Sequence, residues 1–263
     1  MPNSPRRVLI TGAGSGLGLA LAQRYAGRGD RVACIDLLSD RAEAARASLP
    51  GSGHLAHTAD VADDASMQAL AARVAQEWGG LDVLINNAGI ASANAMVDTT
   101  MEEWRKVFEI DLFGVVRGCR LFLPGMLAAG SGQIINTASF AALAGAPGIM
   151  SYGAAKAAVY ALSDQLRAEV HDRGVRVSVV CPAFFRTNLM DTAIADEKTR
   201  ARVVRWMEKS PDSLGSVADK VFAAAERGEF LILPTRREPG YWRLKRWFPQ
   251  LYFRQLVRRS ATR

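Results

Sequence analysis

Residues 11–18 have the sequence TGAGSGLG, and they lie between an apolar segment at 7–11 and a helical pattern at 17–28. A glycine-rich turn between a strand and a helix leaves backbone room for a pyrophosphate and points the positive end of the helix dipole at it. The spacing is Gly12-x3-Gly16-x-Gly18, which differs from the usual Gly-x-Gly-x2-Gly, although Gly14 is also present. We therefore predict a dinucleotide-binding turn here, with an ordinary structural turn as the alternative.

Further along the chain, apolar strand patterns alternate with helical patterns. Strands that are apolar throughout and separated by helices indicate a parallel sheet covered on both faces. We predict an α/β fold with a Rossmann-type, doubly wound parallel sheet of about seven strands and helices on both faces. The predicted strands are 7–11, 31–36, 54–58, 82–86, 133–138, 176–181 and 230–233, and the predicted helices are 17–28, 40–48, 65–78, 101–129, 150–173 and 216–227.

The rest of the chain is expected to form a lobe and a tail. Residues 183–212 interrupt the alternation and are long enough for a lobe that covers a substrate. We expect one domain over residues 1–235 and a basic, aromatic tail over residues 236–263. From residue 235 onward there are nine Arg or Lys against Glu238, a net charge of +8, so the total of +7 leaves −1 for the remainder. An anionic partner would therefore meet the tail.

Composition limits the class of protein. With 263 residues and 49% hydrophobic composition, the chain can bury a substantial core. No run approaches the roughly 18 uninterrupted apolar residues of a membrane span, and residues 2–7 lead directly into a strand without a signal-peptide pattern. We therefore expect a cytoplasmic protein. Cys34, Cys119 and Cys181 lie far apart in apolar runs, which indicates buried reduced thiols rather than a disulfide framework or a zinc site.

Asp36 ends the second predicted strand. An acidic side chain at this place accepts hydrogen bonds from the adenosine ribose hydroxyls and repels a 2′-phosphate. Ser15 leaves the glycine turn without a basic residue, and Leu37 adds none beside Asp36. These residues favour NAD as the cofactor over NADP, with an ordinary loop aspartate as the alternative.

Taken in order, the motifs of the chain resemble those of the short-chain dehydrogenase/reductases, a family of small single-domain NAD(P)-dependent enzymes. The resemblance runs to about Pro234. It implies cofactor contacts from the glycine turn, from the ends of the second to fourth and sixth strands, and from a Tyr-x3-Lys helix. The implied cofactor-binding residues are Gly12, Ser15, Gly16, Leu17, Gly18, Asp36, Asp60, Val61, Asn87, Ala88, Gly89, Tyr152, Lys156, Pro182 and Thr187.

The resemblance also implies a catalytic set of Ser139, Tyr152 and Lys156. Tyr152 and Lys156 are four residues apart on a predicted helix and share one face, a pairing that is common on solvated surfaces when taken alone. In the family, the tyrosine is the general acid or base, held as phenolate by the lysine and the positive charge of the nicotinamide, and the serine hydrogen-bonds the reacting oxygen. The resemblance further assigns the nicotinamide ribose to Lys156, the carboxamide to Thr187, and the fixing of the chain beyond the sheet to Pro182.

One position departs from the family pattern. The family has an asparagine in the fourth helix within Asn-x-x-Gly, where it bends the helix and lets a backbone carbonyl hold a water linked to the lysine. Residues 110–114 have the sequence IDLFG, so Asp111 takes that place. An isosteric aspartate keeps the backbone route of this proton relay but adds a carboxylate near Lys156. We therefore count Asp111 among the catalytic candidates.

The loops after the fourth, fifth and sixth strands are expected to wall the substrate. Their residues are mainly apolar, which favours a hydrophobic secondary alcohol or ketone. Packing of these side chains on one another is the alternative, and Arg186, Arg202 and Arg205 are available for an anionic group. The candidate wall residues are Ile90, Met96, Phe140, Leu143, Ile149, Met150, Phe184, Phe185, Leu189, Met190, Trp206 and Met207.

The tail combines aromatic residues with arginine. On a helical wheel Tyr252, Phe253, Leu256 and Val257 share an arc, a pattern suited to contact with an anionic membrane surface. Packing against a neighbouring subunit or over the substrate mouth explains the same arc. Nucleic-acid binding is not expected, because the sequence contains no recognised module for it.

Members of the family typically form homodimers or homotetramers through the helices that hold Asp111 and Tyr152, so we expect a homo-oligomer. The expected function is that of an NAD-dependent oxidoreductase acting on a lipophilic alcohol or ketone. The alternative, motivated by Asp111 and the tail, is a non-catalytic NAD-binding scaffold or sensor that the tail recruits to a membrane.

Overall fold

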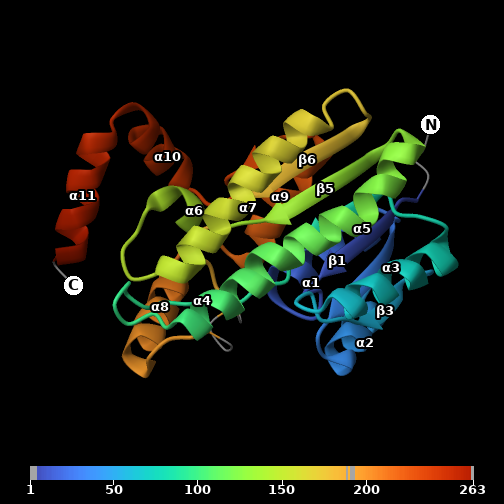
Figure 1. Cartoon of the computed structure of the whole chain (residues 1–263), viewed down its shortest axis with the longest axis horizontal. Helices are drawn as coiled ribbons and strands as arrows, with labels where there is room; N and C mark the ends of the chain where they lie inside the picture. The colour runs from blue at the N-terminus through green and yellow to red at the C-terminus, as the bar shows by residue number, and fades with distance from the viewer. Residues whose placement is uncertain (1–4, 188, 190–192, 262–263) are drawn as a thin grey trace.

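A parallel sheet of seven strands forms the middle layer of the computed structural model, which describes residues 5–187, 189 and 193–261 (Figure 1). All six neighbouring strand pairs are parallel. The strands are β1 Arg7–Thr11, β2 Arg31–Asp36, β3 Leu55–Thr58, β4 Val83–Asn86, β5 Gly132–Thr137, β6 Val175–Val180 and β7 Leu231–Ile232. Their order in the sheet is β3-β2-β1-β4-β5-β6-β7, which confirms the predicted fold class.

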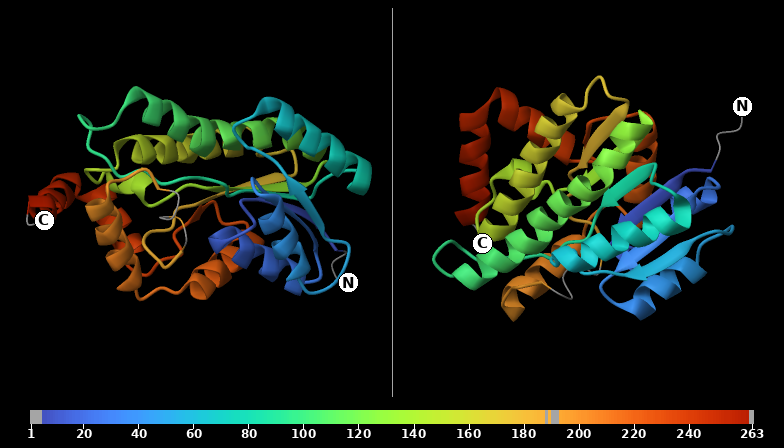
Figure 2. Two further views of the ribbon diagram at one scale, coloured as in Figure 1. Left: turned by 90° about the horizontal axis from the view of Figure 1, so that it is seen from below. Right: turned by 45° about the vertical axis from the view of Figure 1, so that its right-hand side comes forward.

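Helices cover both faces of the sheet. They are α1 Gly16–Gly27, α2 Ser39–Ala47, α3 Asp64–Trp78, α4 Met101–Phe108, α5 Gly114–Ala129, α6 Ala141–Ala144, α7 Met150–Glu169, α8 Glu197–Glu208, α9 Leu214–Glu226, α10 Glu238–Trp247 and α11 Pro249–Ala261. Because side chains alternate along a strand, Val8 and Ile10 pack with α1 and α9, whereas Leu9 packs with α3, α5 and α7. The left view of Figure 2 shows these two helical layers on either side of the sheet.

The crevice of the fold lies between β1 and β4. Val8 is paired with Val32 of β2 on one side and with Val83 of β4 on the other. The strand order therefore reverses at β1, and the connections after β1 and β4 leave on opposite faces of the sheet. Such a reversal opens a crevice at the carboxyl ends of the two strands. The glycine turn and the segment after Asn86 meet at this edge.

The helix predicted at 101–129 is interrupted. α4 is followed by one π-helical turn, Glu109–Phe113, before α5 begins at Gly114. The prediction of a single regular helix is wrong here, because an apolar pattern does not reveal an extra residue in one turn. Asp111 lies in this turn, fully buried, and accepts a hydrogen bond from the backbone N–H of Ile90 at 2.8 Å. π-helical turns of this kind are frequent at functional sites.

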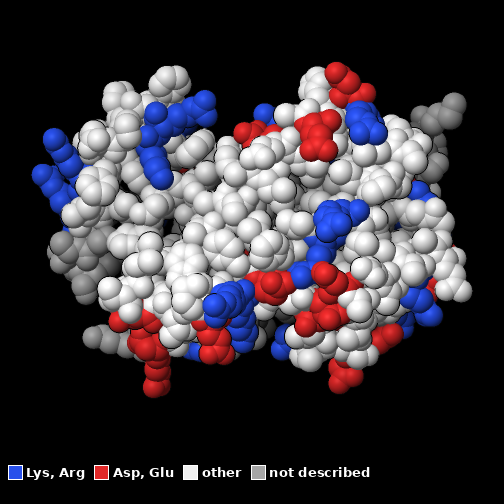
Figure 3. Space-filling view, viewed as in Figure 1, with Lys and Arg blue, Asp and Glu red and all other residues white. Residues whose placement is uncertain are grey.

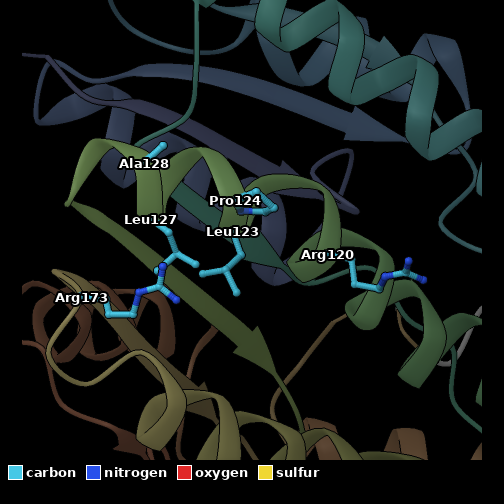
Figure 4. Close-up of a pocket in the computed structure, with 6 residues that line it drawn as sticks. All are labelled: Arg120, Leu123, Pro124, Leu127, Ala128 and Arg173. Carbon is cyan, nitrogen blue, oxygen red and sulfur yellow. The ribbon is translucent and has the colours of Figure 1, made fainter.

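Among the described residues, one helical stretch is long and apolar enough to cross a membrane by length and composition: Met101–Ala129, which contains an 18-residue window of mean hydropathy 1.4. In the structure, Val115, Phe122 and Met126 of this stretch are buried in the core between α5 and the sheet. This is the position of a core helix in an α/β fold. The outer face of α5 carries a groove of about 540 Å³. Its lining combines apolar residues with two arginines: Leu123, Pro124, Leu127, Ala128, Arg120 and Arg173 (Figure 4).

The tail forms two helices, α10 and α11, which Figure 1 shows at the margin of the molecule. Tyr252 is buried, and its hydroxyl donates a hydrogen bond to the carbonyl of Ala144 at 2.9 Å. Phe253, Leu256 and Val257 line a groove of about 750 Å³ whose other wall is formed by α6, α7 and the loop between them. The predicted arc therefore borders this groove: Tyr252 is buried against α6, whereas Phe253 and Val257 line the groove and remain exposed.

The segment 183–212 contains α8, which begins after the N-cap Asp196. The ring of Trp206 on α8 lies edge-on to that of Phe184, with centroids 5.5 Å apart. This contact connects α8 to the loop that follows β6. Of the predicted wall residues in this segment, Met190 lies outside the described residues.

Candidate active site

The glycine turn after β1 is compact, and its backbone segments approach one another closely. Gly12 has φ +65° and Gly16 has φ +54°, the left-handed region that favours glycine. A Cβ at Gly18 would lie 2.2 Å from the carbonyl oxygen of Gly12, and one at Gly16 would meet Thr187 at 3.9 Å and nothing nearer. The backbone of the turn is thus closely packed at Gly18, whereas at Gly16 there is free space between the turn and Thr187. This shape fits a pyrophosphate held at the start of α1, with Ser15 and Leu17 flanking Gly16.

The segment after β4 is tied to this turn. The Oγ1 of Thr11 accepts hydrogen bonds from the backbone N–H groups of Asn87 and Ala88, both at 3.0 Å. The side-chain amide of Asn87 donates in return to the carbonyls of Thr11 and Gly12, at 3.0 and 3.3 Å. These four hydrogen bonds join the carboxyl ends of β1 and β4. The two loops that would hold a dinucleotide are therefore fixed relative to each other.

Asp36 is buried at the end of β2 and is held by backbone donors. Its Oδ2 accepts from the N–H of Gly14 at 3.0 Å and its Oδ1 from the N–H of Leu38 at 3.2 Å. A Cβ at Gly14 would lie 2.5 Å from Oδ2 of Asp36 and 2.6 Å from Cβ of Arg41. The side chain of Arg41 therefore begins beside the carboxylate, a neighbour that the sequence reading missed although it stands five residues after Asp36.

Two further predicted cofactor residues follow β3. Asp60 accepts a hydrogen bond from the N–H of Ala62 at 2.8 Å, which shapes the turn. Val61 is buried, and a Cβ at Gly114 would lie 3.0 Å from it. Val61 is thus packed against the start of α5, next to the crevice edge.

Ser139 and Tyr152 come together from two different elements. Ser139 follows β5, where its Oγ accepts from the N–H of Ala141 at 3.1 Å and reaches the carbonyl of Pro182 at 3.5 Å. Pro182 also accepts from the N–H of Phe140 at 2.8 Å, so the segments after β5 and β6 are joined. Burial raises the pKa of Tyr152, the negative charge of Asp111 raises it further, and a hydrogen bond with Ser139 acts in the opposite direction. The hydroxyl and the phenol are therefore neighbours, as predicted.

Lys156 is buried and lies between Asp111 and the tyrosine. Its Nζ is 3.7 Å from Oδ2 of Asp111, donates to the carbonyl of Thr137 at 3.2 Å, and lies 5.9 Å from the ring centroid of Tyr152. A Cβ at Gly89 would lie 2.8 Å from Oδ1 of Asp111 and 3.2 Å from Nζ of Lys156, so only glycine leaves room there. The ammonium of Lys156 is thus within 4 Å of the Asp111 carboxylate, while burial and that carboxylate raise the pKa of Tyr152.

The electrostatics of Asp111 differ from those of a family asparagine. Burial raises the pKa of the Asp111 carboxyl, while the attraction of Lys156 and the hydrogen bond from Ile90 oppose that rise. Oδ2 of Asp111 has no hydrogen-bond partner among the described residues. A buried acceptor of this kind, 3.7 Å from an ammonium, is a place for a proton or a bridging water in a relay.

A second buried polar cluster was not predicted. Glu103 of α4 hydrogen-bonds Ser92, accepts from the Oγ of Ser151 at 3.0 Å, and accepts from the side chain of Asn94 at 2.8 Å. Ser151 precedes Tyr152, so the cluster fixes the first turn of α7 to α4 and to the loop after β4. The sequence signal is Thr100-x-x-Glu103, a helix-start pattern; it locates the glutamate but not the target of its side chain.

The apolar residues predicted to wall the substrate divide into two groups. Leu143, Phe185 and Met207 are buried in core clusters, so for them mutual packing, the alternative interpretation, is confirmed. Others remain accessible to a ligand: Met96, Met150, Phe184 and Leu189 are exposed, and Ile90, Phe140, Ile149 and Trp206 are partly buried.

The sheet order, the glycine turn and the Ser-Tyr-Lys set define a dinucleotide-dependent oxidoreductase of the Rossmann type. Residues 6–198 match the protein family described as short chain dehydrogenase, so the chain belongs to the short-chain dehydrogenase/reductase family.

Similar proteins of known activity are dehydrogenases of alcohols. The chain is 36% identical over 234 residues to 2-(R)-hydroxypropyl-CoM dehydrogenase of Xanthobacter autotrophicus, covering 86% of this chain and 94% of the relative. It is 40% identical over 183 residues to D-threitol dehydrogenase of Mycolicibacterium smegmatis (69% and 70% covered). It is 33% identical over 226 residues to meso-2,3-butanediol dehydrogenase of Serratia marcescens (85% and 89% covered). The protein is thus an NAD(P)-dependent dehydrogenase acting on CH–OH groups.

Solved structures with the same fold hold either form of the cofactor. A short-chain dehydrogenase/reductase of Burkholderia phymatum in complex with NAD has a TM-score of 0.86 at 28% identity, covering 95% of this chain and 96% of that one. A short-chain dehydrogenase of Sphingobium yanoikuyae in complex with NADPH has a TM-score of 0.79 at 28% identity, covering 96% and 94%. The fold therefore accommodates both cofactors, and the choice depends on the residues around Asp36.

Proposed function

We propose that this protein transfers a hydride between NAD(H) and a hydrophobic secondary alcohol or ketone, with Tyr152 as the general acid or base. The observation that carries the proposal is the convergence of Ser139, Tyr152 and Lys156 at the crevice edge, next to Asp111. In the direction of oxidation, Tyr152 takes the hydroxyl proton of the substrate while Ser139 holds the reacting oxygen. When bound, the nicotinamide accepts the hydride from the substrate carbon, and its positive charge favours the phenolate.

The residues of this chain divide the remaining tasks. The turn at Gly12–Gly18 would hold the pyrophosphate, Lys156 the nicotinamide ribose and Thr187 the carboxamide. The proton that Tyr152 has taken would pass by way of Lys156 to the unpaired Oδ2 of Asp111, which would release it to water. Asp111 thereby adds to the backbone route of the family a carboxylate, which can itself carry the proton.

The cofactor preference is proposed to be NAD. The carboxylate of Asp36 is fixed by two backbone hydrogen bonds, so it cannot turn away from a 2′-phosphate. Because the side chain of Arg41 starts beside it, removal of the carboxylate would leave a guanidinium available for that phosphate. The preference therefore depends on one buried charge.

The substrate is proposed to be lipophilic and the enzyme a homodimer or homotetramer. Met96 and Phe184 on the segments after β4 and β6, and Met150 at the start of α7, are apolar and accessible. Apolar surface that a ligand buries on binding would favour a hydrophobic ligand. The apolar outer face of α5 is the surface that a second copy would cover. Residues 1–235 would form the catalytic domain, with residues 183–212 as its substrate lobe and residues 236–263 as the tail.

The test is NAD reduction by the purified protein with aliphatic, aromatic and steroid-like secondary alcohols. We expect Tyr152→Phe to abolish turnover while NADH still binds. Tyr160→Phe is the matched control, because Tyr160 lies on the same helix but packs on Phe230, with ring centroids 6.1 Å apart. Turnover by Tyr152→Phe at the rate of the parent protein would refute the assignment. Binding of NADH without turnover of any alcohol would favour the scaffold or sensor.

A further inference from the structure

The two C-terminal helices, α10 and α11, form a lobe that is fixed to the body of the protein; we call it the C-terminal lobe. The Nζ of Lys245 donates to the carbonyl of Leu143 at 2.5 Å, and the hydroxyl of Tyr252 donates to the carbonyl of Ala144 at 2.9 Å. Both acceptors belong to α6, which follows Ser139 closely in the chain. The surface of the lobe therefore has a defined orientation relative to the active site.

The corner between α10 and α11 is apolar and exposed. All six residues from 246 to 251 are exposed, and α10 has no buried residue. Within this corner, Trp247 is 71% exposed, Phe248 62% and Leu251 48%. Two adjacent large aromatic side chains exposed to this extent are unusual on a protein surface and mark a site of interaction.

Positive charge surrounds the same corner. Arg243, Arg246 and Arg254 are exposed there, and from residue 236 to the end of the chain Glu238 is the only acidic residue in the sequence. Figure 3 shows this lobe at the upper left, where blue and white atoms are visible and no red ones. An anionic partner is therefore favoured over a neutral one.

The corner is distinct from the groove between α11 and α7. At about 100° per residue, Leu251 and Phe253 point to nearly opposite sides of α11, and Phe253 lines the groove. The groove has apolar side chains on both walls, from α11 on one side and from α6, α7 and the loop between them on the other. The corner, by contrast, combines aromatic rings with arginine heads on the outer side of the lobe.

We propose that the corner residues Trp247, Phe248 and Leu251, with the surrounding arginines, dock the protein on an anionic lipid bilayer. Aromatic rings at the level of the headgroups, next to arginines whose stems lie along apolar surface, are the arrangement that interfacial binding requires. The arginines would meet anionic headgroups. The proposal concerns attachment alone and holds whether or not the substrate is lipophilic.

The test is flotation of the full chain with phosphatidylcholine vesicles containing 30% phosphatidylglycerol, against vesicles of phosphatidylcholine alone. We expect binding to the anionic vesicles that falls with added salt. Each basic residue near an anionic surface strengthens binding about fivefold, so the triple change of Arg243, Arg246 and Arg254 to Gln should weaken it about a hundredfold. The double variant Trp247→Ala, Phe248→Ala should weaken it at least about tenfold.

Phe253→Ala is the matched control, because Phe253 is an exposed aromatic residue of the same lobe that faces the groove. Vesicle binding that Phe253→Ala retains and the corner variants lose supports the proposal. Equal binding to neutral and anionic vesicles, or equal loss with Phe253→Ala, overturns it. So does a change of oligomer mass in the corner variants with vesicle binding intact, because the corner would then contact a second copy. Thermal unfolding of each variant checks that the fold is unchanged.

Discussion

Gly18→Ala offers a direct test of the tight turn after β1. The added Cβ would lie 2.2 Å from the carbonyl oxygen of Gly12 and 2.7 Å from the side-chain nitrogen of Asn87. Carbon and oxygen normally approach to about 3.3 Å, so the turn must open by about 1 Å. Overpacking costs about 1–3 kcal/mol, and the upper end applies because a backbone oxygen cannot rotate away. For a chain of this size about 3 kcal/mol lowers Tm by roughly 6–12 °C.

Gly27→Ala is the matched control on the same helix. A Cβ at Gly27 would have no atom within 4 Å, and alanine lowers the entropy of the unfolded chain, so we expect a gain of about 0.5 kcal/mol. Differential scanning fluorimetry gives both Tm values, and calorimetric titration with NADH gives the Kd. We expect Gly18→Ala to bind NADH at least about tenfold more weakly, because the displaced turn is the one proposed to hold the pyrophosphate. Equal Tm and equal Kd in the two variants would refute the packing argument.

Three further predictions concern single carboxylates. Asp111→Asn removes the charge that raises the pKa of Tyr152, so the acidic limb of kcat/KM for alcohol oxidation should move to lower pH; an unmoved limb in a pH-rate profile would contradict this. Glu103→Ala leaves buried hydroxyl and amide groups unpaired and should cost about 3 kcal/mol in urea unfolding, whereas the exposed neighbour Glu102→Ala should cost less than about 0.5 kcal/mol. Asp36→Ala should raise the ratio of NADP to NAD turnover by about tenfold or more, and an unchanged ratio would remove Asp36 from cofactor selection.

The sheet could be predicted from the sequence because its strands are apolar throughout and turn-forming residues flank them in the sequence. β1 and β2 begin and end at the predicted residues, since each is bounded by a turn or a charged residue. The proposed catalytic set could be named from the sequence, but the electrostatics around it could not. The sequence places Tyr152 and Lys156 four residues apart, while the carboxylate that attracts Lys156 belongs to a π-helical turn, and no periodicity predicts that turn.

The orientation of the tail was also beyond the sequence. A helical wheel shows that one arc of α11 is apolar, and the segment does form a helix. The wheel cannot show whether that arc faces water, lipid or protein, because the answer depends on α6 and α7, which lie 80 or more residues earlier in the chain. Glu103 illustrates the same limit, since its partners Ser92 and Ser151 come from a loop and a helix that only the folded chain brings together.

The position of β1 between β2 and β4 has a consequence for how the chain folds during synthesis. β1 ends at Thr11, but its partner β4 ends at Asn86, so at about 5–20 residues per second the ribosome needs roughly 4–15 s to supply the second neighbour. β1, β2 and β3 can pair in that interval, which leaves the Val8–Ile10 edge of β1 without a partner. An interior strand of the finished sheet therefore begins as an open edge, and a nascent chain that pauses before Val83 is the form most exposed to chaperones and to aggregation.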